Sequence, residues 1–353
     1  MRRRSTTIIG AFGGNNAGDE AILSSISKLI DIADTGRDKN VISLSSNITP
    51  DAVEIYRSEF SSFSTARNIV SSAALCISRD LIIGGGQIIN GSRVPLYLMF
   101  MTSCAALARV TGGRVLMIGV GTNRVHKYFL SSLFANILVR ICNSVYVRDA
   151  HSKRDLLAIG CREEEISIAP DVVLSGVIGR SQIERDRVVV AIHHHPTEQH
   201  LSPKETIDLT IAVASRYPQH KIIVVAHDVR SAFDHGLLSV IASEVRGVET
   251  VALRTAEMAV ELYSKAALVV SSRMHPLIIG LICGSSVVPI SISEKVRDFS
   301  ASYDLRSIDD SSGYGDMNLL AVENKAKIDT ISKRILENRG RLVSIFRDAF
   351  GER

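Results

Sequence analysis

The stretch TTIIGAFGGNNAGDEAILSSI, from Thr6 to Ile26, changes character twice. A β-branched run comes first, a turn rich in glycine and asparagine follows, and an amphipathic segment comes last. Glycine permits a positive φ and lets a ligand approach the backbone closely, and the free N–H groups at a helix start favour an anion. The stretch therefore predicts a strand, a tight turn and a helix, which is how a doubly wound α/β unit begins.

The turn also offers polar side chains, namely Asn15, Asn16 and Asp19. The spacing of its glycines fits neither the dinucleotide fingerprint nor the P-loop with its lysine. A turn that lines a substrate cleft is the functional interpretation. The alternative is that Asp19 only caps the helix, because a carboxylate there complements the helix dipole.

The alternation continues along the whole chain. Runs that are apolar on both faces, such as NVISLSS, RVLMIGV, KIIVVAHD and ALVVSSRMH, are separated by helical segments, which indicates parallel sheets covered on both sides. The rhythm breaks once, at SGVIGRSQIERDR. We therefore expect an α/β fold with two doubly wound Rossmann-like units facing each other across a cleft. The expected boundaries are residues 1–178 for the first unit, 179–186 for the linker, 187–315 for the second unit, and 316–353 for C-terminal helices able to pack back across the linker.

Composition narrows the class of protein. The formal net charge is +4, aromatic residues make up 5% of the chain, and there is no tryptophan. Few rings argue against a groove that stacks single-stranded nucleic acid. The five cysteines form no CxxC pair, which is typical of free thiols in a reducing compartment. No run approaches the roughly 18 apolar residues of a membrane span, so we expect a cytoplasmic protein. Its slight excess of basic residues is compatible with a position at the inner face of the cell membrane.

Three successive glycines follow a buried run in DLIIGGGQIING. Glycines without side chains expose backbone amides, so Gly85 and Gly86 are expected to bind substrate, with Gln87 reaching in beside them. Ligands in doubly wound sheets bind beyond the carboxyl ends of the strands. The expected cleft between the units is therefore the predicted site.

Two further strand ends carry charged residues. Arg148 follows the run SVYV and offers a planar fork suited to a carboxylate or phosphate, although a salt bridge to Asp149 explains it equally well. Asp171 in IAPDVVL could line the cleft, or it could simply form a turn.

The most informative stretch is ALVVSSRMHPLIIGLICGSS. A buried run ends at Ser272, and Arg273 and His275 then flank the start of an apolar helix. Burying a cation there is costly without a partner, and a cation at a helix N-terminus is electrostatically unfavourable. The pair therefore predicts a bound anion that Arg273 and His275 share. Three consecutive histidines in AIHHHPTEQH lack companion ligands at a recognisable spacing, so no metal site is expected.

The motifs GGNNAGDEAIL, DLIIGGG, VRDAHS, PDVVL and SSRMHPLIIGLICGSSVV occur in this order. In these motifs and their spacing the chain resembles the polysaccharide pyruvyl transferases, over nearly its whole length except the last helices. The resemblance implies a GT-B-like fold of two Rossmann-type halves and transfer of the pyruvyl group of phosphoenolpyruvate to a sugar as a ketal, without a metal or other cofactor. It also implies that Arg148, Arg273 and His275 bind phosphoenolpyruvate.

Within that resemblance, His275 is the expected group for the phosphate or the proton, and Asp19 the expected acceptor of the hydroxyl proton. The partners would be phosphoenolpyruvate and a sugar or lipid-linked oligosaccharide, with no nucleic acid. The acceptor and the oligomeric state stay open. The alternatives are a GT-B glycosyltransferase with a nucleotide-sugar donor and a non-enzymatic subunit of a polysaccharide assembly complex. An NAD(P) oxidoreductase is disfavoured, because the glycines do not match the dinucleotide fingerprint.

Overall fold

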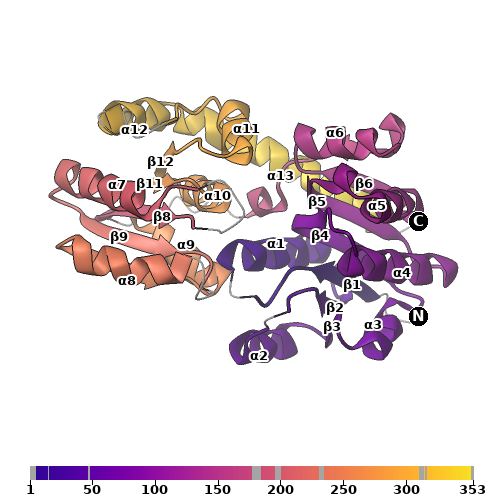
Figure 1. Ribbon diagram of the computed structural model, residues 1–353. Helices are drawn as coiled ribbons and strands as arrows, with labels where there is room; N and C mark the ends of the chain where they lie inside the picture. Colours follow the sequence, from indigo (N-terminus) through magenta and orange to yellow (C-terminus); the bar gives the residue numbers. More distant parts are fainter. Residues whose placement is uncertain are drawn as a thin grey trace. The chain divides into compact units, whose positions relative to one another are not determined.

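The computed structural model describes residues 5–350 except 15, 47, 177–183, 195–199, 230–233, 310–313 and 315. The chain forms two compact units. Unit 1 comprises Met1–Gly14, Asp19–Ser175 and Asn338–Arg353, and unit 2 comprises Asn15–Gly18 and Gly176–Glu337. Each unit contains one parallel sheet flanked by helices (Figure 1). The predicted α/β class with two doubly wound units is confirmed, whereas the predicted linker lies largely outside the described residues.

Unit 1 is built on a seven-stranded sheet with the order β3-β2-β1-β4-β5-β6-β7, in which all neighbours are parallel. The order reverses between β1 and β4, so the switch point of this sheet lies at the carboxyl ends of these two strands, where ligands bind in such folds. The strands are β1 (Ser5–Gly10), β2 (Asp38–Ser43), β3 (Ser62–Thr65), β4 (Asp80–Asn90), β5 (Val115–Asn123), β6 (Ser144–Val147) and β7 (Ser167–Ile168).

The helices of unit 1 cover both faces of its sheet. Buried residues of α3, α4 and α5 join strand residues in one apolar core, for example Met101 and Leu138 against Ile83 and Met117. On α1, Ile22 and Ile26 pack against the glycines of β4. The helices are α1 (Ala17–Ala33), α2 (Pro50–Glu59), α3 (Ile69–Cys76), α4 (Leu96–Val110), α5 (Phe129–Ile141) and α6 (Ala150–Ala158), with short 3-10 turns η1 (Val125–Lys127), η2 (Glu163–Glu165) and η3 (Val172–Ser175).

Unit 2 has a five-stranded parallel sheet with the order β10-β9-β8-β11-β12. Its switch point lies between β8 and β11. The strands are β8 (Arg187–Ile192), β9 (Lys221–Ala226), β10 (Val248–Ala252), β11 (Ala266–Ser271) and β12 (Ser286–Pro289). The helices are α7 (Pro203–Arg216), α8 (Asp234–Glu244), α9 (Ala256–Ser264), α10 (Met274–Ile282), α11 (Glu294–Ser302) and α12 (Met317–Ala326). The last helix, α13 (Ile328–Phe350), begins in unit 2, and its residues from Asn338 on belong to unit 1.

Local sequence explains several helix starts. Thr49 accepts a hydrogen bond from the N–H of Ala52 at the start of α2, and Thr255 caps α9 in the same way. Ser202 and Glu205 form a reciprocal capping box at the start of α7. Each cap satisfies backbone donors that the first helical turn leaves unpaired. None of the described helices is both long enough and apolar enough to cross a bilayer.

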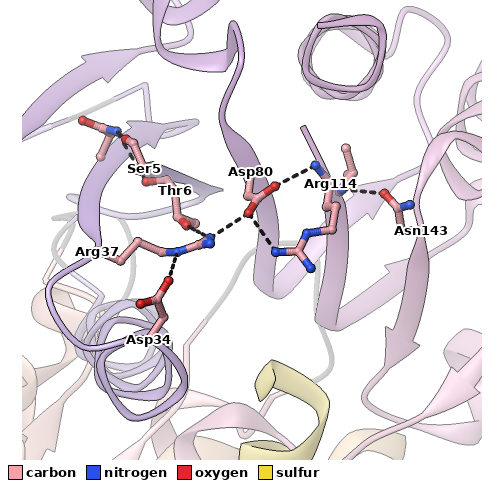
Figure 2. Close-up of polar contacts among 9 residues, drawn as sticks. Ser5, Thr6, Asp34, Arg37, Asp80, Arg114 and Asn143 are labelled. Atoms are coloured by element: carbon pink, nitrogen blue, oxygen red, sulfur yellow. Dashed lines mark hydrogen bonds and ion pairs between the residues drawn. The ribbon is translucent and has the colours of Figure 1, made fainter. Parts of the chain in front are cut away.

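The end of α13 is anchored at the amino ends of the strands of unit 1. Arg37 donates to Thr6 and Asp80, and Asp80 also accepts from the backbone and side chain of Arg114 (Figure 2). The Phe350 ring lies 5.2 Å from the guanidinium carbon of Arg37 and 5.6 Å from that of Arg114. This network holds the C-terminal helix at the amino ends of the strands, opposite to the carboxyl ends where ligands bind. It therefore stabilises the fold of unit 1.

Candidate functional site

In unit 1, the glycines of β4 lie at the switch point, whereas Arg148 and Asp171 follow β6 and β7 farther along the sheet. Gly85 and Gly86 have φ values of +68° and +73°, which other residues rarely adopt, and β4 changes register after Gly86. The strand does not end at these glycines, as the sequence led us to expect, but continues to Asn90. Gln87 donates its side-chain N–H to the carbonyl of Thr122 at 3.1 Å, so its amide is bound to β5. The glycines are therefore a bulge within a paired strand.

Asp19 lies beside this bulge. A Cβ atom on Gly86 would be 3.2 Å from Asp19 Oδ1, so the carboxylate packs directly on the Gly86 backbone. The neighbouring Glu20 has a separate structural role, because it accepts hydrogen bonds from Gly13 N–H and from the Tyr56 hydroxyl. Burial and the Glu20 charge raise the pKa of Tyr56, which keeps the phenol protonated as the donor. Glu20 thus closes the glycine turn, and Asp19 is placed beside the bulge of β4.

Arg148 lies at the end of β6, with its guanidinium against the backbone of Gly121 in β5. A Cβ atom on Gly121 would be 2.8 Å from Arg148 Nη2, so only glycine leaves this space. The predicted salt bridge is present: Arg148 Nε lies 3.1 Å from Asp149 Oδ2, and the Arg148 side chain is 6% exposed. Among the described residues, Asp149 is the acidic partner of Arg148, and it binds Nε rather than the terminal nitrogens.

Asp149 is held in turn by the helix that follows. Its Oδ1 atom accepts a hydrogen bond from Ser152 N–H at 2.7 Å and caps α6. Burial by itself raises the pKa of Asp149, but the charge of Arg148 and the hydrogen bonds from Ser152 outweigh burial, so the pKa lies below its ordinary value. Asp149 is therefore a charged support that orients Arg148.

Asp171 has the turn-forming contact that the sequence suggested as its alternative role. Its Oδ1 atom accepts a hydrogen bond from Val173 N–H at 3.0 Å, at the start of η3. The turn places Val172 against Gly119 of β5. The residue is buried next to the strand ends of unit 1.

In unit 2, Arg273 follows β11 at the second switch point. Its backbone N–H donates to Ser271 Oγ at 2.9 Å, and its Nε donates to the carbonyl of Ile192 at 3.2 Å. Its Nη2 lies 2.9 Å from both carboxylate oxygens of Asp234. Ser272, which precedes it, is 3% exposed.

Asp234 is the functional neighbour that the sequence interpretation missed. It is fully buried in the first turn of α8 and accepts hydrogen bonds from the backbone N–H groups of His194 and Asp228. It thereby joins the ends of β8, β9 and β11. Asp234 supplies a counter-charge to Arg273 from inside the unit, and the anion that Arg273 and His275 are expected to share stays a prediction. An aspartate opening an apolar helix was the only sequence signal for this role.

The side chain of His275 lies against residues near the start of the chain. A Cβ atom on Gly18 would lie 2.4 Å from His275 Nδ1, so the imidazole packs directly on Gly18, which belongs to unit 2 as His275 does. Asn16 accepts from Gly18 N–H through its side chain and forms a bridge with Asp228. Two predicted site residues that are far apart in sequence, Asn16 and His275, are thus gathered in unit 2. Asn15 lies outside the described residues.

His227 supports this cluster from beneath. Its carbonyl accepts from Ala17 N–H at 3.0 Å, and its Nε2 lies 2.6 Å from the Tyr263 hydroxyl. Burial, followed by the charges of Arg273 and His275, lowers the pKa of His227 well below its usual value. The imidazole is therefore neutral at neutral pH.

Two histidines of the HHH run, His193 and His194, meet the ring of His200 edge to face. The rings of His194 and His200 lie 4.6 Å apart, and those of His193 and His200 6.4 Å apart. In the part of the chain that the structure describes, no group of three or more His, Cys, Asp or Glu residues could hold a metal ion.

Comparison with known proteins decides the family. The family described as "Polysaccharide pyruvyl transferase" matches residues 16–294, which is most of the chain. The chain belongs to the polysaccharide pyruvyl transferase family. The matched range includes each described candidate residue of this polysaccharide pyruvyl transferase family member, from Asn16 to His275. No curated protein matches the chain.

Solved structures share the fold of this polysaccharide pyruvyl transferase family member. UDP-GlcNAc 2-epimerase from Methanocaldococcus jannaschii is 11% identical, with a TM-score of 0.59, over 91% of this chain and 92% of that chain. The Neisseria meningitidis enzyme of the same name, bound to UDP-GlcNAc, is 12% identical, with a TM-score of 0.61, over 98% and 99%. Anabaena HepE in complex with UDP and glucose is 14% identical, with a TM-score of 0.58, over 98% of each chain. These TM-scores show a common GT-B-like fold. At identities this low, the likeness does not identify the reaction, which has to be argued from the site residues.

Proposed function

We propose that this protein transfers the pyruvyl group of phosphoenolpyruvate to two hydroxyls of a sugar, forming a ketal during the synthesis of an exopolysaccharide or cell-surface glycan. The observation that carries the proposal is the family match over residues 16–294. The geometry within each unit supports it, because each unit has an arginine that follows the carboxyl end of a parallel strand, Arg148 after β6 and Arg273 after β11.

The two arginines suit the donor. Phosphoenolpyruvate carries a carboxylate and a phosphate, and a guanidinium binds either one through paired N–H donors. Each arginine is oriented by an acidic neighbour, Asp149 for Arg148 and Asp234 for Arg273. An arginine held in place loses less conformational entropy when it binds, which favours affinity. We propose that both arginines bind the donor, one at each charged group.

The reaction balances without a cofactor. Protonation of the methylene carbon of phosphoenolpyruvate makes C2 electrophilic, and a sugar hydroxyl oxygen forms a bond to C2 as its proton leaves. The bond between C2 and the phosphate oxygen then breaks, and phosphate departs with the electron pair. A second hydroxyl forms the second C–O bond and loses its proton, which completes the ketal.

The roles of the other groups follow from their chemistry. We propose that His275 delivers the proton or contacts the phosphate, because imidazole exchanges protons near neutral pH. Asp19, placed on the Gly86 backbone, would accept a hydroxyl proton. The substrate-binding set is completed by the remaining candidates, namely Asn15, Asn16, Gly85, Gly86, Gln87, Asp171 and Ser272.

The direct test is release of inorganic phosphate from phosphoenolpyruvate over a panel of free and lipid-linked oligosaccharides, with mass spectrometry of the sugar product. An acceptor-dependent release with a pyruvyl ketal on the sugar is expected. General acid–base catalysis contributes roughly 10²–10⁴-fold, so His275→Ala should lower turnover by that order, and near-normal turnover would remove its catalytic role. Arg273→Lys should raise the KM for phosphoenolpyruvate, while Arg187→Lys, at the amino end of β8, should not.

A second candidate is a glycosyltransferase with a nucleotide-sugar donor. It is favoured by the fold shared with structures that contain UDP-GlcNAc or UDP with glucose. Thermal unfolding in the presence of phosphoenolpyruvate, UDP-glucose or UDP-GlcNAc separates the two, because a ligand raises the melting temperature only if it binds the native state. A shift with the nucleotide sugars and none with phosphoenolpyruvate would favour the second candidate.

A further inference from the structure

The outer face of α5 is apolar except for Arg140 in its last turn, although it faces solvent. Phe129 is 80% exposed, and Leu130, Leu133 and Ile137 are between 37% and 41% exposed. At about 100° per residue, these four side chains fall within one arc of roughly 100° on the helix. The buried residues of α5, such as Leu138, fall on the opposite side. A helix that is apolar on both sides normally lies inside a protein or against a membrane.

A second exposed apolar group lies in a segment that is joined to α5. In the segment before α4 and in its first turn, Val94, Leu96 and Tyr97 are 62%, 67% and 48% exposed. The segment is fastened to α5 by two hydrogen bonds, from Ser92 N–H to Ser131 Oγ and from Ser131 Oγ to the Ser92 carbonyl, each 2.9 Å long. We call the combined patch the α4–α5 apolar surface; it consists of Val94, Leu96, Tyr97, Phe129, Leu130 and Leu133.

The segments that carry this surface contain basic residues and no acidic ones. Residues 81–148 contain seven Arg and Lys residues and no Asp or Glu, in a chain with 37 acidic residues among 353. Three of these cations, Arg93, Arg124 and Lys127, are exposed in the segments that carry the apolar side chains. An exposed apolar patch of this kind marks an interaction site, and its basic surroundings select an anionic partner.

We propose that the α4–α5 apolar surface docks on a lipid bilayer that contains anionic headgroups. Apolar side chains that enter the boundary between headgroups and acyl chains, together with cations at the headgroup level, are the two parts of interfacial binding. Tyr97 suits the same boundary, because its ring is apolar and its hydroxyl polar. A symmetric contact with a second copy would bring two sets of the cations Arg93, Arg124 and Lys127 together, which is repulsive.

The α12 helix offers a contrast within the same chain. Leu319 and Val322 are 58% and 66% exposed there, but acidic Asp316 and Glu323 accompany them. Exposed apolar side chains therefore occur both on α12 and on the α4–α5 apolar surface. The absence of acidic residues from its segments distinguishes the α4–α5 apolar surface. Val322 provides a matched control position.

The test is co-sedimentation of the full chain with phosphatidylcholine vesicles, with and without phosphatidylglycerol. Binding to the phosphatidylglycerol vesicles should exceed binding to the neutral ones and should weaken as salt rises. Phe129→Glu with Leu133→Glu should lower the partition coefficient by at least about tenfold. Arg124→Glu with Lys127→Glu should lower it by about fivefold for each removed cation, on anionic vesicles only. Val322→Glu should leave it unchanged.

Thermal unfolding of each variant checks that it folds, and the exposure of Phe129 and Val322 predicts wild-type melting temperatures. Equal sedimentation of wild type with both kinds of vesicle, or equal loss in Val322→Glu, would overturn the proposal. So would self-association that Phe129→Glu abolishes in a protein that does not bind vesicles. The proposal is independent of the donor, because phosphate release with a water-soluble acceptor should be the same in Phe129→Glu and wild type.

Discussion

The guanidinium of Arg273 lies 2.9 Å from the carboxylate of Asp234, which is fully buried at the start of α8. The same carboxylate accepts the backbone N–H groups that follow β8 and β9. One aspartate thus neutralises the cation at the second switch point and fixes three strand ends relative to it. Asp234 is a positioning residue for Arg273.

Asp234→Ala should lower the free energy of unfolding by about 3 kcal/mol, because it leaves a largely buried guanidinium and two backbone N–H groups unpaired. Asp234→Asn keeps one acceptor and should be less affected. Both variants should bind phosphoenolpyruvate more weakly, as measured by calorimetry under native conditions. Asp186→Asn removes the exposed pair with Arg187 and should change the free energy of unfolding by less than about 1 kcal/mol. Wild-type affinity in a folded Asp234→Asn protein would contradict the positioning role.

Gly121→Ala should weaken donor binding without unfolding the protein. The added methyl group would lie 2.8 Å from Arg148 Nη2, and the guanidinium can move because it ends a flexible side chain. We expect at least about a tenfold rise in the dissociation constant for phosphoenolpyruvate, with a nearly unchanged melting temperature. Gly340→Ala is the control, because nothing lies within 4 Å of that position in α13. An unchanged dissociation constant in Gly121→Ala would show that the position of Arg148 does not matter to the donor.

Gly18→Ala should displace the imidazole of His275, since the new methyl group would lie 2.4 Å from Nδ1. Turnover in the phosphate-release assay should fall toward that of His275→Ala, by roughly 10²-fold or more. If the two changes act through the same ring, the double variant should be no slower than His275→Ala alone. If the losses of turnover from the two changes multiply in the double variant, Gly18 has a role that is independent of His275.

Stability should depend on pH through His227. Its pKa is lowered in the folded protein, so below the ordinary histidine pKa of about 6.5 the unfolded chain binds a proton that the folded protein does not. The free energy of unfolding should therefore fall as the pH drops below about 6.5, by up to about 1.4 kcal/mol per pH unit from this group. Urea titrations between pH 7 and 5 measure the slope, which should be smaller in His227→Gln. Parallel slopes for the variant and wild type would rule out His227 as the source.

Several elements could be predicted because their signal is local. The buried runs of β1, β4, β5 and β11 and the amphipathic pattern of α1 are visible residue by residue. The strand β3, with the sequence SFST, was missed because four residues with two serines have no apolar periodicity. It exists because it pairs with β2, a contact that no short stretch of sequence reveals.

The sequence by itself determined the family, the alternation of strands and helices, and the residues that follow the strand ends, because these depend on motifs and on periodic burial along the chain. Tertiary structure alone decided the partners of those residues. The Arg273–Asp234 pair spans 39 positions, and the contact between His275 and Gly18 joins distant parts of the chain. Charge pairing and close packing act through space, and a parallel sheet with crossover connections brings together the ends of strands that are far apart in sequence.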